Sequence, residues 1–525
     1  MEAVVTRELA PGRSEVALCA LTAAVTVTLV AALGPPGGDA AAHLYRTELV
    51  RDGVTIWDNL WFAGHYPLAS YSLLYYVFAA LIGNTLLVAG GAVVSASLFA
   101  ALAHAEWSDA ARWPARAFAV LAATPLYTGT YSYSLGIAAA LGALRLLQIG
   151  RPWPALVACA VTLGFAPLAF AFLCIALGAV ALARNRVRVP VAVGLALIAV
   201  LELAILLLFP SDGRYPFSSL SLAATLTASG LGAALAWRDE RAASLRWFFV
   251  LWGAVAIAGF LVQSPFGDNL TRLRTMILPL VLLAAALAGF RPRWLAGGAV
   301  LFAFGYNVAP DLSALPKRLD DTRTAQATFW QPALHVVAGE VNHRVAVVPT
   351  FGHWEAFWVP QAGVALARGW YRQLDITANP ELYRAPLAPA TYRRWLDRTA
   401  VRYVLLPNAR LGPMGASREA ELLRSGSSGL DVILRSSDWT VYEVPDPTPI
   451  LEGGMLTRLD HDLVAGRVAA PGSYRLRIRW SPYWSAAGAV CVERARDGTT
   501  ILRATRAGPF RLRAALPGSA RCSGI

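Results

Sequence analysis

The fold is decided by the stretch GGDAAAHLYR, residues 37–46. It follows the first long apolar run and Pro35-Pro36, so a turn presents the Asp39 carboxylate where the chain leaves that run. His43 and Arg46 come four and seven residues later, which places all three side chains on one face of a helix that begins near Asp39. Asp also favours helix N-caps, so a plain helix start with a solvated face is the alternative. An acid, an imidazole and a guanidinium gathered at the edge of an apolar run favour a functional site.

The composition is that of an integral membrane protein. Of 525 residues, 56% are hydrophobic and only 15% are charged, which is outside the usual range of soluble globular domains. The net charge of +13 comes mostly from Arg, and part of it lies in short loops, where it indicates topology rather than nucleic-acid binding. No basic run with interleaved aromatic residues indicates a nucleic-acid partner, and no Gly-x-x-x-x-Gly-Lys loop indicates an ATP-driven pump.

The chain is predicted to cross the membrane eleven to thirteen times. The first span is Val16 to Leu33, with its N-terminus in the cytoplasm. The further apolar runs are 68–83, 84–103, 116–128, 133–149, 153–166, 167–183, 190–209, 219–236, 247–263, 275–290 and 294–308. These make twelve with the first, whereas an inside N-terminus and an outside C-terminus need an odd number, so one run is wrongly divided, interfacial or re-entrant. The weak points are Tyr71–Gly83, Thr124–Ser134 and Thr162–Pro167.

Charge in the connecting loops orients these spans. The Arg-rich segments 184–188, 238–246 and 291–293 are predicted to be cytoplasmic. Residues 211–216 and 264–269 then fall outside, together with the first loop. The last span delivers the C-terminal region to the outside as well.

The first outside loop, residues 34–66, continues beyond Asp39 with an aromatic segment that contains Asp58 and His65. Trp, Phe and Tyr mixed with polar residues suit a segment that lies along the lipid headgroups. Such a segment either anchors the chain in the interface or forms a surface for a lipid-linked substrate, and both roles can hold at once.

Beyond residue 308 the chain changes character. Residues 345–348, 403–406 and 439–444 are predicted to be strands and 391–398 a helix. After residue 449 the pattern becomes all strand, including the alternating run 473–480 and a turn at Asp497-Gly498. The predicted domains are therefore a transmembrane domain over 1–308, an extracytoplasmic α/β region over 309–449 and a C-terminal β-sandwich over 450–525. The fold class is mainly α, a polytopic transmembrane helical bundle with these appended regions.

The five cysteines offer little metal chemistry. Cys19, Cys159 and Cys174 lie inside apolar runs and are predicted to pack as small hydrophobes. Cys491 and Cys522 lie in the polar C-terminal end, where an extracytoplasmic location would allow a disulfide between them. The sequence leaves that pairing open.

These features together resemble a known superfamily. A first helix, an outside loop with Gly-Asp-x-x-x-His-Leu-x-Arg, and an aromatic stretch that ends in Tyr66-Pro67 are similar to the GT-C superfamily of multispanning glycosyltransferases. The chain most resembles bacterial membrane proteins labelled as uncharacterised or as 6-pyruvoyl-tetrahydropterin-synthase-related. The resemblance implies a lipid-phosphate-linked sugar as donor, an acidic residue early in the first outside loop as catalytic base, and a soluble domain outside. The matching acid is Asp39.

The chain departs from the metal-dependent members of that superfamily. Those members carry a second acidic pair in an outside loop, and the membrane half has none; Asp460-His461-Asp462 is the nearest candidate but lies in the distal β-region. A metal-independent reaction without a cofactor is therefore expected, with a divalent metal possible but not indicated. Asp39 would deprotonate the acceptor hydroxyl. Positive side chains of the outside loops would stabilise the departing lipid phosphate.

The substrate contacts are predicted from the polar residues of these outside segments. His353 lies in the aromatic stretch 351–358, which suits either sugar binding or simple packing. The arginines could equally pair with lipid headgroups. The predicted substrate-binding residues are His43, Arg46, Asp58, His65, Arg214, Arg272, Arg274 and His353.

The expected function is transfer of a sugar from a polyprenyl-phosphate donor to an acceptor of the cell envelope, at the outer face of a bacterial plasma membrane. The expected partners are the lipid-linked donor, a glycan or other envelope acceptor, and membrane lipids, with no nucleic acid. Two alternatives stay open: a non-catalytic membrane scaffold for envelope assembly, and a transporter of a lipid-linked intermediate. Ion-coupled transport is disfavoured because few ionisable residues lie within the spans.

Overall fold

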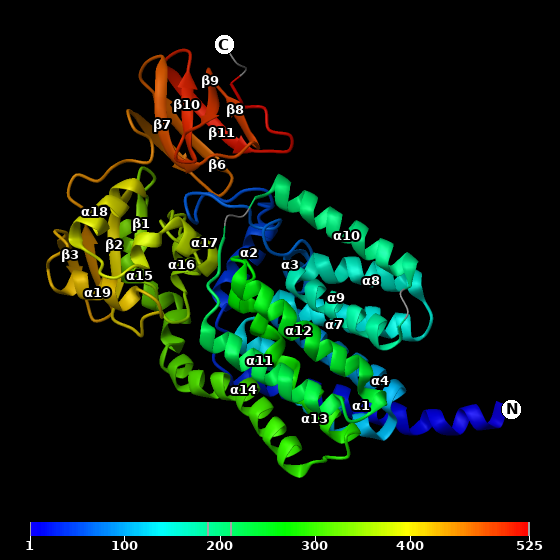
Figure 1. Cartoon of the computed structure of the whole chain (residues 1–525). Coiled ribbons are helices and arrows are strands. Elements are labelled where there is room, and N and C mark those ends of the chain that lie inside the picture. The colour runs from blue at the N-terminus through cyan, green and yellow to red at the C-terminus, as the bar shows by residue number, and fades with distance from the viewer. Residues whose placement is uncertain (1, 186–187, 211–212, 523–525) are drawn as a thin grey trace. The chain divides into compact units, whose positions relative to one another are not determined.

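The computed structural model describes residues 2–185, 188–210 and 213–522. Residues 186–187 and 211–212, which belong to two of the predicted loops, lie outside the described residues. The chain forms two compact units (Figure 1). The helical unit comprises Met1–Gly37, Tyr71–Pro210 and Arg214–Pro316, and the mixed unit comprises Gly38–Ser70, Ser211–Gly213 and Lys317–Ile525.

The helical unit is a bundle in which α1 packs against α4 and α5, and α7 packs against α4 and α8. Its helices are α1 (Glu2–Leu33), α3 (Tyr75–Ile82), α4 (Asn84–Trp107), η1 (Ser108–Ala111), α5 (Arg112–Leu121), α6 (Thr124–Thr128), α7 (Tyr131–Gln148), α8 (Pro152–Phe165), α9 (Pro167–Ala183), α10 (Val189–Leu208), α11 (Ser219–Ala236), η2 (Glu240–Ala242), α12 (Ala243–Leu261), η3 (Gly267–Met276), α13 (Ile277–Leu287) and α14 (Arg293–Asp320). Proline in the first turn sets the start of α8 and of α9, because its missing N–H is not needed there.

Six helical segments of the described chain are long and apolar enough to cross a membrane. They are Gly12–Leu33, Asn84–Thr128, Val189–Leu208, Ser219–Ala236, Glu240–Leu261 and Gly267–Leu287. This is fewer than the predicted eleven to thirteen. The segment Asn84–Thr128 covers two of the predicted runs, α7 and α14 are not among the six, and α8 and α9, at 14 and 17 residues, are shorter than the roughly 20 residues that a bilayer requires. The prediction of a polytopic, mainly helical membrane chain is confirmed.

Two of the predicted apolar runs do not coincide with a helix of the structure. The run 68–83 contains only the 8-residue helix α3, which spans about 12 Å and is too short for a crossing. The end of the last span, placed at residue 308, falls inside α14, which continues to Asp320 through Pro310 and Pro316. In both cases the length of the apolar run in the sequence differs from the length of the helix in the structure.

The mixed unit contains a four-stranded sheet in the order β1-β2-β4-β3, in which β1 and β2 are parallel. Its elements are α2 (Ala40–Arg51), η4 (Thr322–Ala325), α15 (Ala327–Val337), β1 (Arg344–Val347), α16 (Glu355–Gln361), α17 (Arg372–Ala378), η5 (Pro380–Leu382), α18 (Pro389–Arg398), β2 (Val401–Pro407), α19 (Ala416–Arg424), β3 (Asp431–Arg435) and β4 (Trp439–Glu443). Trp395, Val404 and Tyr442 join the helices to the sheet in one buried cluster. The predicted strands and the helix at 391–398 are confirmed, and β3 is an addition.

The C-terminal part of the mixed unit consists of two antiparallel sheets, in the orders β5-β6-β11-β8 and β7-β10-β9. Their strands are β5 (Gly454–Leu459), β6 (Leu463–Val468), β7 (Gly472–Arg479), β8 (Trp484–Ala487), β9 (Val490–Arg494), β10 (Thr499–Ala504) and β11 (Gly508–Ala514). This region of β-sheets follows the helices as predicted, and the turn at Asp497-Gly498 joins β9 to β10. Cys491 and Cys522, which the sequence left open, form a disulfide.

The first loop belongs to the same compact unit as the C-terminal region. The Leu366 N–H donates to the Leu60 carbonyl at 2.8 Å, and the Asn59 N–H donates to the His461 carbonyl at 2.7 Å. A third backbone bond of 2.8 Å runs from Arg479 to Ala63. The loop that carries Asp39 is thereby bound to both the four-stranded sheet and the β-region.

Candidate functional site

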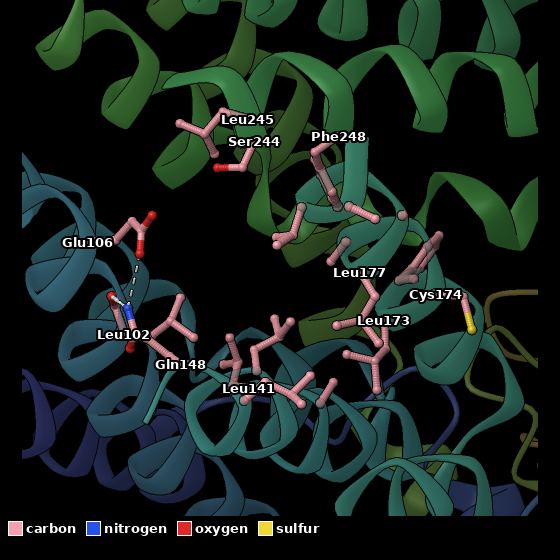
Figure 2. A pocket seen from close by; sticks show the side chains of 18 of the residues that line it. Leu102, Glu106, Leu141, Gln148, Leu173, Cys174, Leu177, Ser244, Leu245 and Phe248 are labelled. Carbon is pink, nitrogen blue, oxygen red and sulfur yellow. Dashed lines mark hydrogen bonds between the residues drawn. The ribbon is translucent and has the colours of Figure 1, made fainter. Parts of the chain in front are cut away.

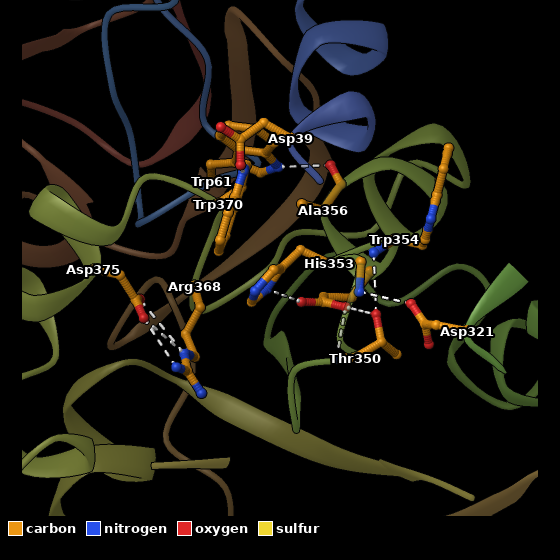
Figure 3. A network of polar contacts seen from close by, with 12 residues as sticks. Asp39, Trp61, Asp321, Thr350, His353, Trp354, Ala356, Arg368, Trp370 and Asp375 are labelled. Atoms are coloured by element: carbon orange, nitrogen blue, oxygen red, sulfur yellow. Dashed lines mark hydrogen bonds and ion pairs between the residues drawn. The ribbon is translucent and has the colours of Figure 1, made fainter. Parts of the chain in front are cut away.

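Asp39 stands at the start of α2, as the sequence predicts, but its side chain does not cap that helix. Instead, the indole Nε1 of Trp370 donates a hydrogen bond of 2.9 Å to Asp39 Oδ1 (Figure 3). The Asp39 side chain is half-buried. The carboxylate is therefore positioned by a residue that lies 331 positions away, and helix capping does not account for its orientation.

Two guanidinium groups of the mixed unit lie next to neighbours of Asp39. A Cβ added at Gly38 would lie 2.7 Å from Arg318 Nη2, so glycine next to Asp39 is what lets the Arg318 side chain approach the backbone there. Arg372 stands over the Trp370 ring, with its Cζ 5.1 Å from the ring centroid. The surroundings of Asp39 thus combine an acid with two permanent positive charges.

His353 packs against Trp370. The two rings stack with centroids 3.5 Å apart and planes inclined by 23°. The Nδ1 atom of His353 lies 3.0 Å from Glu355 Oε1, and Thr350 donates to Glu355 Oε2 from its backbone N–H at 3.1 Å and from its hydroxyl at 2.8 Å. These bonds fix the carboxylate of Glu355, which in turn fixes the imidazole, so Figure 3 shows a connected chain of contacts from Thr350 to Asp39.

The electrostatics keep His353 neutral. Burial lowers the pKa of its imidazole, and the hydrogen bond to Glu355 offsets only part of that effect. With Nδ1–H donating to Glu355, the neutral ring presents Nε2 as an acceptor. Within the described residues Nε2 has no hydrogen-bond partner. The His353 side chain lines a hollow of about 20 Å³ together with Arg368, Trp370 and Arg372, which is room for about one water molecule.

The backbone at His353 is constrained as well. Its φ is +55°, a left-handed conformation that costs a non-glycine residue on the order of 1 kcal/mol or more. The preceding N–H, that of Gly352, donates to Asp321 Oδ2 at 2.7 Å. Burial raises the pKa of Asp321 to about 7, although this hydrogen bond opposes the shift. The segment that presents His353 is therefore held by a carboxyl group that titrates near neutral pH.

A buried ion cluster supports the loop that carries Trp370. Arg368 pairs with Asp375 at 2.9 Å and with Glu419 at 3.1 Å. Tyr383 also donates to Asp375, and Tyr392 donates to Glu419 at 2.9 Å. Arg368 and Asp375 flank the segment 369–374 and pair with each other. This pair fixes both ends of the segment that carries Trp370, whose indole donates to Asp39.

Asp58 and His65, two predicted substrate contacts, lie in a separate buried network. Asp58 is 0% exposed and accepts hydrogen bonds from Tyr45 Oη at 2.8 Å and from the Leu60 N–H at 3.2 Å. His461 Nδ1 lies 3.0 Å from Asp58 Oδ1, and His65 Nδ1 lies 3.4 Å from Asp58 Oδ2. This network links the first loop to the β-region.

The charges in this network follow from burial and pairing. Burial would raise the pKa of Asp58, but the hydrogen bond to His461 and the nearby imidazoles lower it. Burial would lower the pKa of His461, but the bond to Asp58 raises it. Burial lowers the pKa of His65 to about 3 despite Asp58. These shifts favour an Asp58–His461 ion pair beside a neutral His65.

The other predicted residues fall in different places. His43 and Arg46 lie on α2 and are buried, at 2% and 0% exposure; Arg46 Nη1 donates to the Pro67 carbonyl at 2.7 Å and its Cζ lies 3.9 Å from the Tyr371 ring centroid. Arg214, Arg272 and Arg274 belong to the helical unit. Of the five predicted residues in the first loop, only Asp39 is not fully buried.

The structure thus brings two of the predicted residues, Asp39 and His353, into one cluster through Trp370. Sequence reasoning missed Arg318 and Asp321 there, whereas Arg372 lies in the stretch 369–375, which by sequence suits either sugar binding or simple packing. The aromatic stretch around His353 gave a signal for that residue and for Glu355, whereas Arg318 lies in a helix that the sequence predicts to have ended already.

Comparison with known proteins finds similarity to solved structures but to no family model. No protein-family model matches the chain, and no curated protein matches it. Among solved structures, the chain is similar to ArnT from Cupriavidus metallidurans in the apo state, at 12% sequence identity and a TM-score of 0.39, over 84% of this chain and 98% of that one. The geometry around Asp39 therefore carries the functional proposal.

Proposed function

We propose that this protein is a membrane glycosyltransferase that moves a sugar from a polyprenyl-phosphate donor to an acceptor of the cell envelope, with Asp39 as general base. The observation that carries the proposal is the position of the Asp39 carboxylate. It is half-buried, it begins a helix without capping it, and it accepts a hydrogen bond from Trp370. Arg318 approaches the adjacent Gly38, and Arg372 stands over the Trp370 ring.

In the proposed reaction a single displacement occurs at the anomeric carbon of the donor sugar, and the groups around Asp39 act as follows. The acceptor hydroxyl oxygen attacks the anomeric carbon as its proton passes to Asp39, and the bond from that carbon to the phosphate oxygen breaks. The electron pair leaves with the lipid phosphate. Arg318 and Arg372 are suited to stabilise that phosphate, because guanidinium groups bind phosphate oxygens through paired N–H donors.

His353 and Glu355 serve as positioning residues in this scheme. The stacked His353 ring supports the indole that holds Asp39, and Glu355 fixes the ring through Nδ1. A base must keep hydrogen-bond distance to the proton that it takes, so a rigid support for Asp39 contributes to the rate.

The test is a transfer assay with the purified full chain in lipid nanodiscs. Sugar-labelled polyprenyl-phosphate donors and nucleotide sugars are offered in parallel, with envelope lipid and glycan fractions as acceptors. We expect transfer from a polyprenyl-phosphate donor and a loss of roughly 100- to 10,000-fold in the Asp39→Asn variant. The matched control is Asp52→Asn, since Asp52 lies at the other end of α2 and is exposed.

Two results would overturn the proposal. Transfer from nucleotide sugars alone would exclude a polyprenyl-phosphate-linked sugar as the donor. No transfer by the wild type from any donor, together with an unchanged envelope in cells that carry Asp39→Asn, would favour the non-catalytic scaffold.

A further inference from the structure

The helical unit contains an apolar cavity of about 610 Å³ that the proposed reaction does not use. Its walls come from α4, α7, α9, α10, α12 and the η3–α13 segment. Figure 2 shows leucine and phenylalanine side chains around an open centre, with Glu106 and Gln148 on one side and Cys174 on the other. The volume lies within the range of roughly 300–1,000 Å³ that small-molecule sites occupy.

The polar residues that line the cavity gather at one end of the bundle. They lie at the ends of α4, α7 and α9 and at the starts of α10 and α12, and they are Glu106, Gln148, Arg184, Arg188 and Ser244. Arg184 and Arg188 belong to one Arg-rich segment of the sequence, and a second, 238–246, joins α11 to α12 at this end. The positive-inside rule predicts that this end faces the cytoplasm.

We call this polar end of the cavity its mouth. The charged side chains that line the mouth, Glu106, Arg184 and Arg188, have a net positive charge. Arg184 Nη2 pairs with Glu106 Oε1 at 3.0 Å, which balances one guanidinium. Arg188 is exposed, and its Nη1 donates to the Leu147 carbonyl at 3.3 Å. Trp107 also lines the cavity and donates to the Arg241 carbonyl at 2.8 Å, and tryptophan is characteristic of membrane interfaces.

The cavity is deep enough for a lipid chain. Residues of α9 and its C-cap Arg184 line it from Ala169 to Arg184, a rise of about 22 Å at 1.5 Å per residue. One leaflet contributes about half of the roughly 30 Å hydrocarbon thickness. An apolar cavity does not hold ordered water, so a hydrocarbon chain is the occupant that matches its apolar lining.

We propose that this cavity holds one acyl chain of an anionic phospholipid from the leaflet that the Arg-rich loops face, with the lipid phosphate beside Arg184 and Arg188. Basic pockets between membrane helices on the cytoplasmic side suit anionic headgroups. The site is independent of the reaction at Asp39, because it lies wholly within the helical unit.

The test measures lipid binding to the full chain by native mass spectrometry. The delipidated protein in mild detergent is titrated with phosphatidylglycerol and, separately, with phosphatidylcholine of the same chains. We expect one retained phosphatidylglycerol per chain and at least tenfold weaker retention of phosphatidylcholine.

Variants at the mouth test the charge. Arg188→Gln should weaken phosphatidylglycerol binding several-fold, whereas Glu106→Gln should strengthen it, because it releases Arg184 from its partner. Arg241→Gln is the control, since Arg241 is exposed, pairs with Asp239 and does not line the cavity. Both test residues stand at the mouth, so opposite effects on binding cannot come from a common loss of folding.

Variants in the wall test the chain site. Ala176→Phe places a ring inside the cavity and should abolish retention of both lipids, whereas Ala171→Phe, on the same helix but outside the lining, should leave it unchanged. Equal retention by both wall variants would overturn the proposal. So would identical binding of the two lipids, or displacement of phosphatidylglycerol by a polyprenyl phosphate that binds more tightly.

Discussion

At the scale of single residues, Asp39 differs from the other acids of its loop in how its carboxylate is held. Asp58 is fully enclosed and accepts bonds from three neighbours, so it acts as a link between chain segments. Asp39 is half-buried and bound to an indole that is itself stacked on an imidazole. A general base must come within hydrogen-bond reach of its substrate, and the half-buried Asp39 suits that role better than the enclosed Asp58.

The pair His353–Glu355 should affect the rate of transfer without entering the reaction. Replacing Glu355 by Gln removes the charge that orients His353, so we expect kcat to fall roughly 10- to 100-fold through misplacement of Trp370 and Asp39, with KM for the donor little changed. Steady-state kinetics of Glu355→Gln and His353→Gln check this.

The chain contains a matched control for that experiment. His343 and Glu340 form a similar pair, with Nδ1 3.2 Å from the carboxylate oxygen, next to β1. His343→Gln should leave kcat unchanged. An equal loss of kcat in both histidine variants would mean that the effect is a general loss of stability.

Asp321 should make the stability of the mixed unit depend on pH. Its pKa is raised to about 7 in the folded chain, above the value of about 3.9 expected when unfolded. Its contribution is therefore fully present below about pH 4 and is lost as the pH rises through 7. Compared with Asp321→Asn, the wild type should lose up to about 1.4 kcal/mol of stability per pH unit over that window.

Thermal unfolding in detergent, followed from pH 4 to pH 8 for both proteins, measures this difference. Parallel pH profiles for wild type and Asp321→Asn would show that Asp321 ionises normally in the folded chain.

At the scale of elements, the Asp58–His461 pair joins the first loop to the C-terminal β-region. Removing one member of a buried ion pair leaves the other charge uncompensated and costs roughly 3–5 kcal/mol. We therefore expect Asp58→Ala and His461→Ala each to lower the unfolding temperature of the purified chain. The double variant should be less destabilised than the sum of the two, because the two residues share one interaction. Additive losses would contradict a direct pair.

The same pair shows how far the sequence alone could lead. The helix that begins after Asp39, the strands at 401–407 and 439–443, and the turn at Asp497-Gly498 follow from local patterns, and the structure has them. Asp58 and His461 are 403 residues apart, and no local pattern connects them. The sequence identified Asp58 and His65 as polar residues of an aromatic loop, but it could not show that they would be enclosed.

The candidate site around Asp39 also combines residues that local sequence patterns could select with contacts that they could not predict. The types of residue at Asp39 and in the stretch 351–358 were sufficient to select both as candidates. Their meeting depends on Trp370, whose indole reaches Asp39 across 331 positions of chain. Arg318 could not be found at all, because hydrophobicity indicates the end of a span and not the end of the helix that carries it.

At the scale of the whole molecule, the first loop and the C-terminal region share one compact unit, as expected if both lie on the same side of the membrane. Cysteine labelling tests that topology. Ser437→Cys, which is exposed beside β4, should react with a membrane-impermeant maleimide in intact spheroplasts. Asp109→Cys, which is exposed in η1 beside the helix ends that carry Glu106, should react only after permeabilisation. The reverse pattern would invert the topology and exclude an outward-facing site.

The central claim is that Asp39 performs chemistry whereas the other buried acid of its loop holds the fold. The most direct measurement sets Asp39→Asn beside Asp58→Asn, with sugar transfer from a polyprenyl-phosphate donor and unfolding temperature determined on the same preparations. The account predicts that Asp39→Asn abolishes transfer and leaves the unfolding temperature within a few degrees of the wild type, and that Asp58→Asn lowers the unfolding temperature. Transfer that survives in Asp39→Asn, at an unfolding temperature equal to that of the wild type, would contradict it.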